Sequence, residues 1–394
     1  MTASRPVGVT APAGFAAAGV EAGLKAHGGR DVALVVTRGP HPASAGVFTS
    51  NRVVAAPVTL TRAHLARSTL RAVILNSGGA NACTGEPGAA DAAATAQHVA
   101  EALGMGAEEV GVCSTGLIGE RLAMDALLAG ADAAVAALDD TGQAGAAAAD
   151  AIRTTDTVAK TVAVAGDGWT IGGMAKGAGM LAPGLATMLC VLTTDALVDG
   201  PAAQAALEEA VRTTFDRTDS DGCMSTNDSV ILLSSGASET APDPAVFAER
   251  LTRACADLAR QLIGDAEGAS HDIAITVRGA SDEAAAEACA RAVSRSNLFK
   301  AAVFGNDPNW GRVLAQVGTV PASVAPFDPA RLDVGINGVQ VCRAGGIGDP
   351  RDGVDMTGRQ VDVLVDLHAG GAEATVWTND LTHGYVHENS AYSS

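Results

Sequence analysis

Aromatic residues are nearly absent from this chain, since Phe, Trp and Tyr together make up 3% of its 394 residues. Hydrophobic residues nevertheless account for 47%, so the interior must be built mostly from Ala, Val and Leu. That apolar fraction, with Gly and Pro spread along the chain, excludes a disordered protein. The length allows two domains, or two packed halves, with a large core.

Positive charge is also scarce. The formal net charge is −18, which argues against nucleic acids and anionic membranes as partners. No apolar run is long enough to cross a membrane, and Glu21 and Lys25 interrupt the Ala-rich N-terminal region, which therefore does not resemble a secretory signal. We expect a cytoplasmic protein without a membrane span.

The seven cysteines offer neither a CxxC pair nor a Cys/His spacing typical of zinc sites. An odd number of scattered thiols indicates a reducing compartment, and we expect no metal. The chain also lacks the GxxxxGK[ST] loop that binds nucleotides and the GxSxG elbow of the α/β-hydrolases.

Lysine is rare as well, with Lys25, Lys160, Lys176 and Lys300 as the whole set. The last three lie in segments rich in Gly and Thr that look functional. Lysine is a compact, tunable point charge that Arg does not replace well in a tight site. The alternative is that all four are ordinary surface lysines.

Predicted strands and helices alternate irregularly. Apolar runs with β-branched residues predict strands near residues 32–37, 58–60, 72–76, 110–113, 158–165, 188–192, 230–233, 273–277, 298–304 and 361–367. Helical periodicity covers residues 89–103, 122–138, 201–215, 245–263 and 282–294. Because no strict strand–helix–strand repeat is present, we expect a layered α/β or α+β fold, with 182–187 as the best candidate boundary.

The most informative segment, residues 172–196, reads GGMAKGAGMLAPGLATMLCVLTTDA. A tight turn of small residues leads to Ala186 and Thr187, and an apolar strand-like run follows. A hydroxyl residue placed there can attack the preceding carbonyl, and hydrolysis of the ester would leave Thr187 as a new N-terminus. Its α-amine, with a pKa of about 8, could then take the hydroxyl proton. The alternative is an ordinary turn before a buried strand.

Two further polar turns follow predicted structure. Thr115 and Gly116, in CSTGLIGE, come directly after a strand and could present a hydroxyl and a backbone N–H in one direction, as an oxyanion hole requires. TTDT, residues 154–157, ends a helical run. Taken alone, the first is more typical of a generic turn, and the second of a helix or turn cap.

Eight segments together resemble the glutamate/ornithine N-acetyltransferases, the ornithine acetyltransferase family of arginine biosynthesis. They occur in the family's order over nearly the whole chain: NSGGANACTG (76–85), STGLIG (114–119), TTDT (154–157), GGMAKGAGMLAPGLATML (172–189), STNDS (225–229), EGA (267–269), GNDPNWGR (305–312) and YVHENSAYSS (385–394). The fourth segment is highly specific to that family. The combination outweighs the alternative explanations of the single motifs.

The resemblance implies a fold of two αβ halves of the self-processing aminopeptidase/ornithine acetyltransferase type, with a Thr or Ser nucleophile. It implies cleavage between Ala186 and Thr187 into an α chain, 1–186, and a β chain, 187–394. Two copies of each would form an α2β2 heterotetramer.

The resemblance also implies the site residues. Thr187 would be the nucleophile, and Thr115 and Gly116 would form the oxyanion hole. The substrate-binding residues would be Thr154, Lys176, Thr187, Glu267, Asn389 and Ser394.

The implied reaction is a ping-pong acetyl transfer from N2-acetyl-L-ornithine to L-glutamate through an acetyl-Thr187 ester. It uses neither a metal nor a cofactor, and the sequence leaves open whether acetyl-CoA is also a donor. From charge alone, Lys176 suits a substrate carboxylate and Glu267 an ammonium group.

The sequence departs from the family in two places. Ser270 and His271 stand where the family usually has Thr-Lys, so we expect different polar contacts around Glu267. The acidic loop reads DGCMSTND, which makes a role for Cys223 or Met224 unexpected.

Two rival functions stay open: a self-processing aminopeptidase or amidohydrolase of the same architecture, whose members tend to have Gly-Ser at the cleavage point, and a non-catalytic binding protein that kept the fold.

Overall fold

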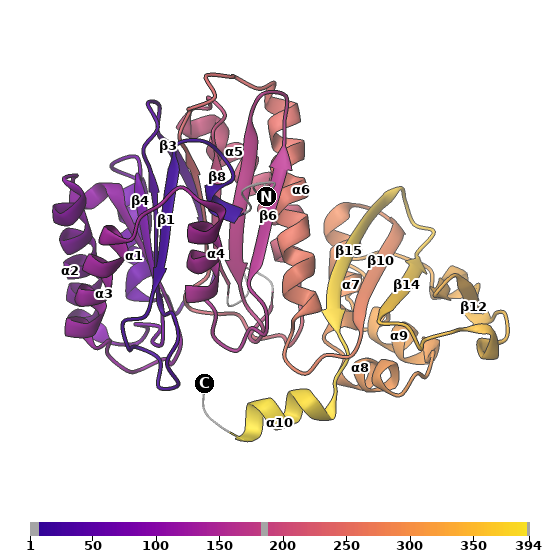
Figure 1. Ribbon diagram of the computed structural model, residues 1–394. Coiled ribbons are helices and arrows are strands. Elements are labelled where there is room, and N and C mark those ends of the chain that lie inside the picture. Colours follow the sequence, from indigo (N-terminus) through magenta and orange to yellow (C-terminus); the bar gives the residue numbers. More distant parts are fainter. Residues whose placement is uncertain (1–7, 183–187, 392–394) are drawn as a thin grey trace, which may run out of the picture. The chain divides into compact units, whose positions relative to one another are not determined.

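The structure is a computed structural model that describes residues 8–182 and 188–391. These residues form two compact units (Figure 1). Unit 1 holds the chain up to Asp216 and the segment Cys223–Asp265, and unit 2 holds Arg217–Gly222 and the chain from Ala266 onward. The loop at 182–187 does not separate the units, because the strands before and after it pair within unit 1. The division into 1–186 and 187–394 stays a prediction about cleavage.

Unit 1 contains two sheets. The first has four strands in the order β1 (Phe15–Val20), β2 (Val32–Thr37), β4 (Ala72–Ser77) and β5 (Val110–Thr115). The second has five strands in the order β3 (Ala43–Phe48), β9 (Ser229–Ser234), β8 (Leu189–Thr194), β7 (Thr170–Lys176) and β6 (Lys160–Ala165). Neighbouring strands are antiparallel except β4–β5 and β8–β9, which are parallel.

Helices cover the outer faces of these sheets, which gives unit 1 four layers (Figure 1). Apolar side chains of both sheets meet in one core, where Val35 and Leu75 of the first sheet join Val191 and Ile231 of the second. The first sheet is covered by α2 (Gly85–Leu103) and α3 (Met124–Ala136), and the second by α5 (Gly200–Thr213) and α6 (Pro244–Gly264). The shorter elements are η1 (Gly8–Thr10), α1 (Ala56–Leu65), η2 (Ala107–Glu109), α4 (Gly142–Ala151) and η3 (Phe215–Arg217).

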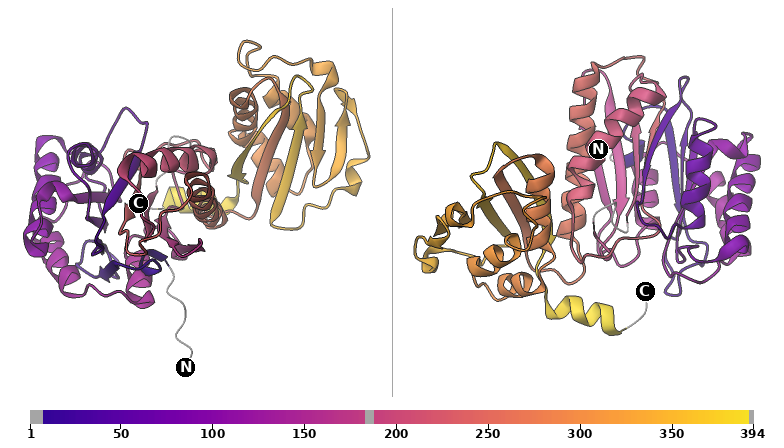
Figure 2. Two further views of the ribbon diagram at one scale, coloured as in Figure 1. Left: turned by 90° about the horizontal axis from the view of Figure 1, so that it is seen from above. Right: turned by 180° about the vertical axis from the view of Figure 1, so that it is seen from behind.

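Unit 2 is built on one six-stranded sheet, seen from two further sides in Figure 2. Its strand order is β13 (Gly346–Ile347), β12 (Val339–Arg343), β11 (Asp333–Ile336), β14 (Gln360–Asp366), β10 (Asp272–Ala280) and β15 (Ala372–Asn379). Its core joins the sheet to α7 (Glu283–Ser294), α8 (Asn297–Phe304) and α9 (Trp310–Val317). The remaining elements are η4 (Pro329–Arg331), η5 (Arg351–Gly353) and α10 (His383–Ala391).

Short polar side chains start most of the helices at the positions where the sequence changes from loop to helical pattern. Asp282, for example, caps α7 by accepting the Ala285 N–H at 2.8 Å, which satisfies one of the donors that a helix start leaves unpaired. The same kind of cap begins α4, α5, α6, α8 and α9, from Thr141, Asp199, Asp243, Ser296 and Asn309.

The predicted layered αβ architecture is confirmed, and all five predicted helices exist. Two predicted strands are wrong: residues 58–60 lie in α1, and residues 298–304 lie in α8. Pro57 in the first turn of α1 and the Ser296 cap of α8 are helix-start signals that outweigh the β-branched and aromatic content of these short runs. None of the helices in the described part of the chain is long and apolar enough to cross a membrane.

Candidate active site

The predicted site residues fall into three groups. Thr115, Gly116, Thr154 and Lys176 lie in unit 1, and Glu267 and Asn389 lie in unit 2. Ala186, Thr187 and Ser394 complete the predicted site, and all three lie outside the described residues.

Thr115 and Lys176 meet inside unit 1. Thr115 ends β5 and Lys176 ends β7, and each side chain is 2% exposed. The Lys176 Nζ donates to the Thr115 Oγ1 at 3.4 Å. Because a hydroxyl can accept and donate at once, this contact leaves the Thr115 proton for another acceptor. The pair therefore provides a hydroxyl donor backed by a buried positive charge, as the predicted oxyanion hole requires.

Gly116 has a backbone conformation that only glycine adopts easily. Its φ is +134°, and a Cβ there would lie 2.5 Å from the backbone nitrogen of Gly79. The loop that carries Gly79 is fastened to the end of β5, since the Gly78 and Gly79 N–H groups both donate to the Thr115 carbonyl, at 2.9 and 3.0 Å. The backbone after Thr115 is thus held in one orientation.

We expect Gly116→Ala to lower the kcat for acetyl transfer by about 100-fold, because the added Cβ forces the backbone to shift where the oxyanion donor is predicted. Gly119→Ala is the matched control, since Gly119 also has a positive φ, +87°, but a Cβ there meets nothing within 4 Å. Steady-state kinetics of both variants measure the difference. Equal kcat values for Gly116→Ala and Gly119→Ala would remove Gly116 from the catalytic machinery.

Asp156, inside TTDT, joins two predicted substrate residues through one buried carboxylate. It accepts the backbone N–H of Thr154 at 3.0 Å and lies 3.9 Å from the Lys176 Nζ. It also accepts the Gly177 N–H at 2.6 Å and the Lys160 Nζ at 2.7 Å. Burial favours the protonated acid, but Lys176, Lys160 and the Gly177 N–H outweigh it and lower the pKa of Asp156 to about 2.

Lys160 is fully buried and has a second partner. Its Nζ lies 2.6 Å from Asp265, which follows α6 and accepts the Thr157 N–H at 3.0 Å. The side chain is 0% exposed, so these ion pairs are held away from solvent. A buried ammonium persists only when it is paired. Lys160 and Asp156 therefore form a buried ion pair next to Lys176, which holds the Asp156 carboxylate in place.

Three of the four lysines are buried, which favours the interpretation that they are functional rather than ordinary surface lysines. Lys160, Lys176 and Lys300 are 0%, 2% and 6% exposed. Lys25 is half-buried and donates to the Arg30 carbonyl in a surface loop. It has no part in the site.

Three of the motif segments, NSGGANACTG, STGLIG and STNDS, are joined to one another by hydrogen bonds. The Ser114 Oγ donates to Asn76 at 2.6 Å, and the Asn76 amide donates to the Gly79 carbonyl at 3.1 Å. From STNDS, the Asn227 amide donates to the carbonyls of Ala80 at 2.6 Å and Ser114 at 2.8 Å. All of these side chains are buried. NSGGAN and STNDS thus fix the loops on both sides of Thr115.

In unit 2, Glu267 and Asn389 are brought together. The Asn389 amide, on α10, donates to the Glu267 Oε2 at 2.9 Å. Glu267 opens onto a cavity of about 50 Å³ that also exposes the side chain of Lys300, whose pKa is lowered by burial against the attraction of Asp221, Asp219 and Asp380. The cavity is lined by Ser220, Asp221, Glu267, Asn297, Lys300, Asn379, Asp380, Leu381 and Tyr385.

The departure at Ser270 and His271 has a structural explanation. Both side chains bond Asp380: the Ser270 hydroxyl donates to it, and the His271 Nδ1 lies 2.8 Å from its Oδ2. Burial raises the pKa of Asp380, and the hydrogen bonds from Ser270 and His271 outweigh that effect and lower it. The two residues anchor the segment after Glu267, and neither contacts Glu267 by any bond among the described residues.

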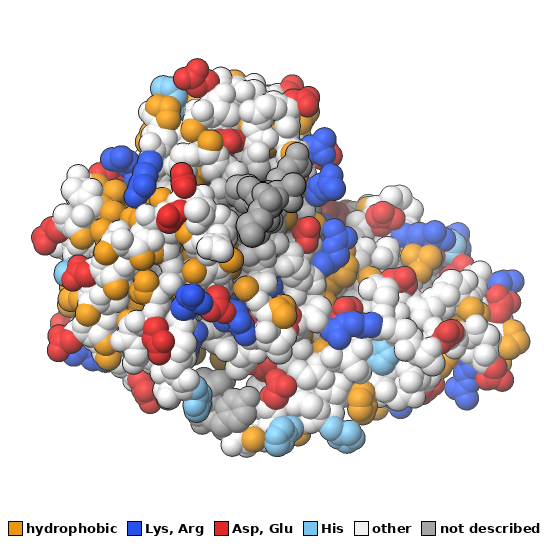
Figure 3. All heavy atoms as spheres, in the orientation of Figure 1, with side chains coloured by type: hydrophobic (Ala, Val, Ile, Leu, Met, Phe, Trp, Pro, Cys, Tyr) orange, Lys and Arg blue, Asp and Glu red, His pale blue; other side chains and the backbone are white. Residues whose placement is uncertain are grey.

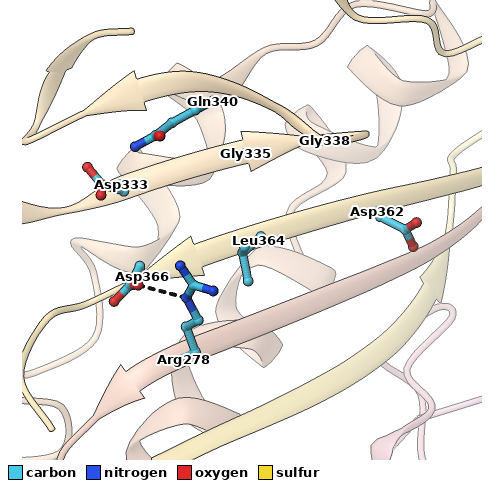
Figure 4. A pocket seen from close by; sticks show the side chains of 8 residues that line it. All are labelled: Arg278, Asp333, Gly335, Gly338, Gln340, Asp362, Leu364 and Asp366. Carbon is cyan, nitrogen blue, oxygen red and sulfur yellow. Dashed lines mark hydrogen bonds and ion pairs between the residues drawn. The ribbon is translucent and has the colours of Figure 1, made fainter. Parts of the chain in front are cut away.

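Unit 2 also has a larger hollow, about 410 Å³, on the open face of its sheet (Figure 4). Arg278 and Asp366, which lie opposite each other on the neighbouring strands β10 and β14, form an ion pair at 2.7 Å on its lining. No predicted site residue lines it. On the molecular face drawn in Figure 3, acidic and basic side chains are interspersed. Within residues 8–182 and 188–391, no cluster of His, Cys, Asp and Glu is placed to hold a metal ion.

Asp156, Lys160, Asn227 and Asp228 were not among the predicted site residues. Three of them lie in predicted motifs, Asp156 in TTDT and Asn227 and Asp228 in STNDS, so the motifs already marked these segments as functional. What the sequence could not show is that the carboxylate of TTDT faces two lysines at the ends of different strands. Cys223, in contrast, is exposed and remains without an expected role.

Comparison with known proteins gives the same family along almost the whole chain. The sequence matches the ArgJ family over residues 16–394. It is 59% identical over 386 residues to the arginine biosynthesis bifunctional protein ArgJ of Streptomyces avermitilis, which covers 98% of this chain and 100% of that protein. The protein of the same name from Bifidobacterium longum is 58% identical over 389 residues, with the same coverage.

Among solved structures, an ornithine acetyltransferase is similar over part of the chain. A chain of the ornithine acetyltransferase of Mycobacterium tuberculosis, crystallised with ornithine, is 57% identical, with a TM-score of 0.45, and the match covers 47% of this chain and 98% of that one. The full-length sequence matches decide the assignment: this chain belongs to the ArgJ family.

Proposed function

We propose that this chain transfers the acetyl group of N2-acetyl-L-ornithine to L-glutamate, which releases L-ornithine and N-acetyl-L-glutamate. Thr187 is the nucleophile, freed by self-cleavage after Ala186. The observation that carries the proposal is the buried Thr115–Lys176–Asp156 cluster, in which three motifs of the family converge at the ends of β5 and β7. Relatives named as bifunctional arginine biosynthesis proteins, 58–59% identical over their full length, support it.

The reaction proceeds in two halves. The Thr187 α-amine takes the hydroxyl proton, and the oxygen attacks the acetyl carbonyl carbon. The Thr115 hydroxyl and the Gly116 N–H stabilise the oxyanion, the C–N bond breaks, and the ornithine nitrogen leaves with the proton. The unprotonated amine of glutamate then forms a bond to the carbonyl carbon of the acetyl-Thr187 ester, and the ester C–O bond breaks. The proton lost by the glutamate nitrogen returns through the Thr187 amine to the Thr187 oxygen, and N-acetyl-L-glutamate departs.

The charges of the two units suit amino-acid substrates. Lys176 provides a positive charge for a carboxylate, and Glu267, oriented by Asn389, provides a negative charge for an ammonium group. Asp156 stays ionised, with a pKa of about 2, and together with Asp265 it balances the two buried lysines. Of these charges, the Lys176 ammonium contacts the Thr115 hydroxyl. That arrangement favours an anionic substrate group and a developing oxyanion in unit 1.

The proposal includes three further elements. The two chains assemble as an α2β2 heterotetramer in the cytoplasm. No metal or bound cofactor is required, because the amine of Thr187 supplies the base and the loop after β5 supplies the electrostatic stabilisation. Acetyl-CoA is a second acetyl donor for the same Thr187, and release of free CoA in the presence of glutamate tests it.

The two candidate activities differ in the acceptor of the acetyl group, which is glutamate in acetyl transfer and water in hydrolysis. Purified enzyme is given N2-acetyl-L-ornithine with and without L-glutamate, and ornithine and N-acetylglutamate are quantified. We expect ornithine to accumulate beyond one equivalent per active site only with glutamate, accompanied by equal N-acetylglutamate. Sustained release of ornithine and free acetate without glutamate would instead indicate the aminopeptidase or amidohydrolase activity.

We expect Asn389→Ala to raise the KM for N2-acetyl-L-ornithine by about tenfold, with little change in kcat or melting temperature, because the exposed Glu267–Asn389 bond orients a charged binding group and adds little to folding. Ser390→Ala, on the next residue of α10, is the control. An unchanged KM in Asn389→Ala would show that α10 has no part in substrate binding.

A further inference from the structure

Lys300 is buried, and the proposed function does not use it. It lies in the first half of α8, and its side chain is 6% exposed. Its Nζ donates to the carbonyl of Ser220, in the short segment Arg217–Gly222 of unit 2. Because an ammonium group has three N–H donors, this bond leaves two of them for other acceptors.

The carboxylates near Lys300 are engaged elsewhere or lie too far away for an ion pair. Asp219 pairs with an arginine side chain at 2.7 Å, and both Asp380 oxygens accept hydrogen bonds from residues 270–271. These two and Asp221 attract the ammonium group from a distance. Within the described part of the chain, no carboxylate forms an ion pair with it. A buried ammonium is costly unless it is paired, so its place in unit 2 needs an explanation.

The cavity beside Lys300 is the one onto which Glu267 opens. Its volume is about 50 Å³, whereas one water needs about 10–15 Å³. The cavity therefore has room for a small charged group, such as an ammonium or a carboxylate, and not for a whole amino acid. Asn389 bonds one oxygen of Glu267, and among the described residues no ion pair joins Glu267 to Lys300. The cavity thus exposes a carboxylate and an ammonium group that do not pair with each other.

The two substrates differ in charge at the end of the side chain. In N2-acetyl-L-ornithine the α-nitrogen is an amide, so the ammonium group of this substrate is at the end of its side chain. L-Glutamate has a carboxylate at that end. Both substrates have an α-carboxylate and react at the α-nitrogen. A site that binds the two side chains in turn must therefore accept a positive group in the first half-reaction and a negative group in the second.

Glu267 suits the ammonium group of the donor and would repel the carboxylate of the acceptor. Two further acidic residues, Asp221 and Asp380, line the cavity, which favours a positive group there. Among the residues that line it, Lys300 provides the positive charge. A carboxylate can enter a site of this composition when an ammonium group contacts it directly, because such charge-assisted hydrogen bonds are the strong ones.

We propose that Lys300 is a specificity-determining residue for the acceptor: its ammonium group binds the side-chain carboxylate of L-glutamate in the cavity where Glu267 binds the side-chain ammonium of N2-acetyl-L-ornithine. This inference rests on the proposed function. It assigns the two charged groups of one cavity to opposite half-reactions, and it involves no covalent step.

A structural role for Lys300 is the alternative, because its bond to Ser220 also fastens the segment Arg217–Gly222 to α8. That segment has another attachment, since the Asp219 N–H donates to the Trp377 carbonyl at 2.8 Å. A carbonyl needs only one neutral donor, and a buried charge is an expensive way to supply it. A structural role predicts that both substrates are affected equally when Lys300 is replaced, whereas the proposed role predicts that only the acceptor is.

The test uses the acceptors L-glutamate and L-glutamine, which are nearly equal in size and differ in side-chain charge. Lys300→Met removes the charge and retains an unbranched apolar side chain. Lys25→Met is the matched control, because Lys25 also donates to a backbone carbonyl, that of Arg30 at 2.7 Å, outside the site. In a ping-pong reaction the kcat/KM of each substrate depends on its own half-reaction alone, so the donor and the acceptors are measured separately.

We expect wild-type enzyme to have a kcat/KM about 100-fold higher for L-glutamate than for L-glutamine. Lys300→Met should lower the value for L-glutamate by more than about tenfold, with little change for L-glutamine. Its kcat/KM for N2-acetyl-L-ornithine should not fall, because the lost charge does not attract an ammonium group. Glu267→Gln should show the reverse order, with the larger loss for N2-acetyl-L-ornithine. Lys25→Met should match the wild type for every substrate.

Three outcomes would overturn the inference. Lys300→Met could keep the wild-type preference for L-glutamate over L-glutamine, it could lose the donor and both acceptors in equal proportion, or the wild type could use both acceptors equally well. The second outcome would indicate a structural role. Failure of the proposed function is different, because the wild type would then form no N-acetylated product from N2-acetyl-L-ornithine with either acceptor. If Lys300→Met does not fold, Lys300→Gln, which keeps a donor for Ser220, decides by the same ratio.

Discussion

Replacing Thr187 with alanine leaves a single chain of 394 residues that transfers no acetyl group. The hydroxyl of Thr187 is required twice, first to attack the Ala186 carbonyl and then to attack the acetyl carbonyl of the substrate. The alanine variant lacks both the attacking oxygen and the free α-amine, and the oxyanion donors alone cannot replace a nucleophile. Intact mass and the glutamate-dependent assay measure the two losses.

The control for this variant is Thr187→Ser, which retains the hydroxyl and is expected to cleave. Serine lacks the β-methyl group that restricts χ1, so its hydroxyl is less firmly oriented, and a slower reaction is expected. A Thr187→Ala protein that is still cut between residues 186 and 187 would refute the nucleophile assignment. A Thr187→Ala protein that is uncut but active would refute the role of the new N-terminus.

The second large effect is expected from Asp156→Ala, which should reduce the free energy of unfolding by about 3–5 kcal/mol. The substitution leaves Lys160 with Asp265 alone and removes the carboxylate next to Lys176, and both lysines are buried. Breaking one side of a buried ion pair is costly because the remaining charge is uncompensated. Acetyl transfer should fall with it, since Asp156 also holds the Thr154 N–H.

Urea unfolding of Asp156→Ala measures the loss of stability. The matched control is Asp150→Ala, because Asp150 lies six residues earlier and pairs with Arg30 and Arg153 while 37% exposed. Exposed ion pairs contribute about 0–1 kcal/mol, so this variant should unfold near the wild type. If the two variants lose equal stability, the buried cluster is not what supports Lys176.

The same carboxylate predicts how stability depends on acid. Asp156 has a pKa of about 2 in the folded protein and an ordinary value near 4 when unfolded. Its contribution, about 2 kcal/mol, is therefore complete above pH 4 and is lost as the pH falls toward 2. Asp156→Asn should show a smaller decrease in stability over this window than the wild type. An identical decrease would place the acid sensitivity elsewhere.

Much of the fold follows from hydrophobic pattern and helix caps. Residues 32–37 and 110–113 read as buried strands and form β2 and β5, and the polar start at Asp282 begins α7. Strand β7 could not be predicted, because Gly172 and Gly173 have low strand propensity. Glycine is present in β7 because of tertiary packing: a Cβ at Gly172 would lie 2.1 Å from the Gly8 carbonyl oxygen. Only close packing explains glycine there.

The candidate site likewise contains residues that the sequence predicts and supporting residues that it does not. Motif order along the chain predicts Thr115 and Lys176, and their hydrogen bond in the structure is consistent with that prediction. The supporting residues could not be predicted, because Asp156 acts on a lysine twenty positions later and Asp228 acts on the residue after the cleavage point. Such pairings depend on which strand ends lie side by side, and no local pattern encodes that.

The most direct test of the central claim is the intact mass of both chains after wild-type enzyme is mixed with N2-acetyl-L-ornithine alone and quenched in acid. The account predicts a chain of residues 187–394 that gains the mass of one acetyl group and loses it when glutamate is added, with the chain of residues 1–186 unchanged. An uncut protein, or acetylation absent from the 187–394 chain while ornithine is released, would contradict it.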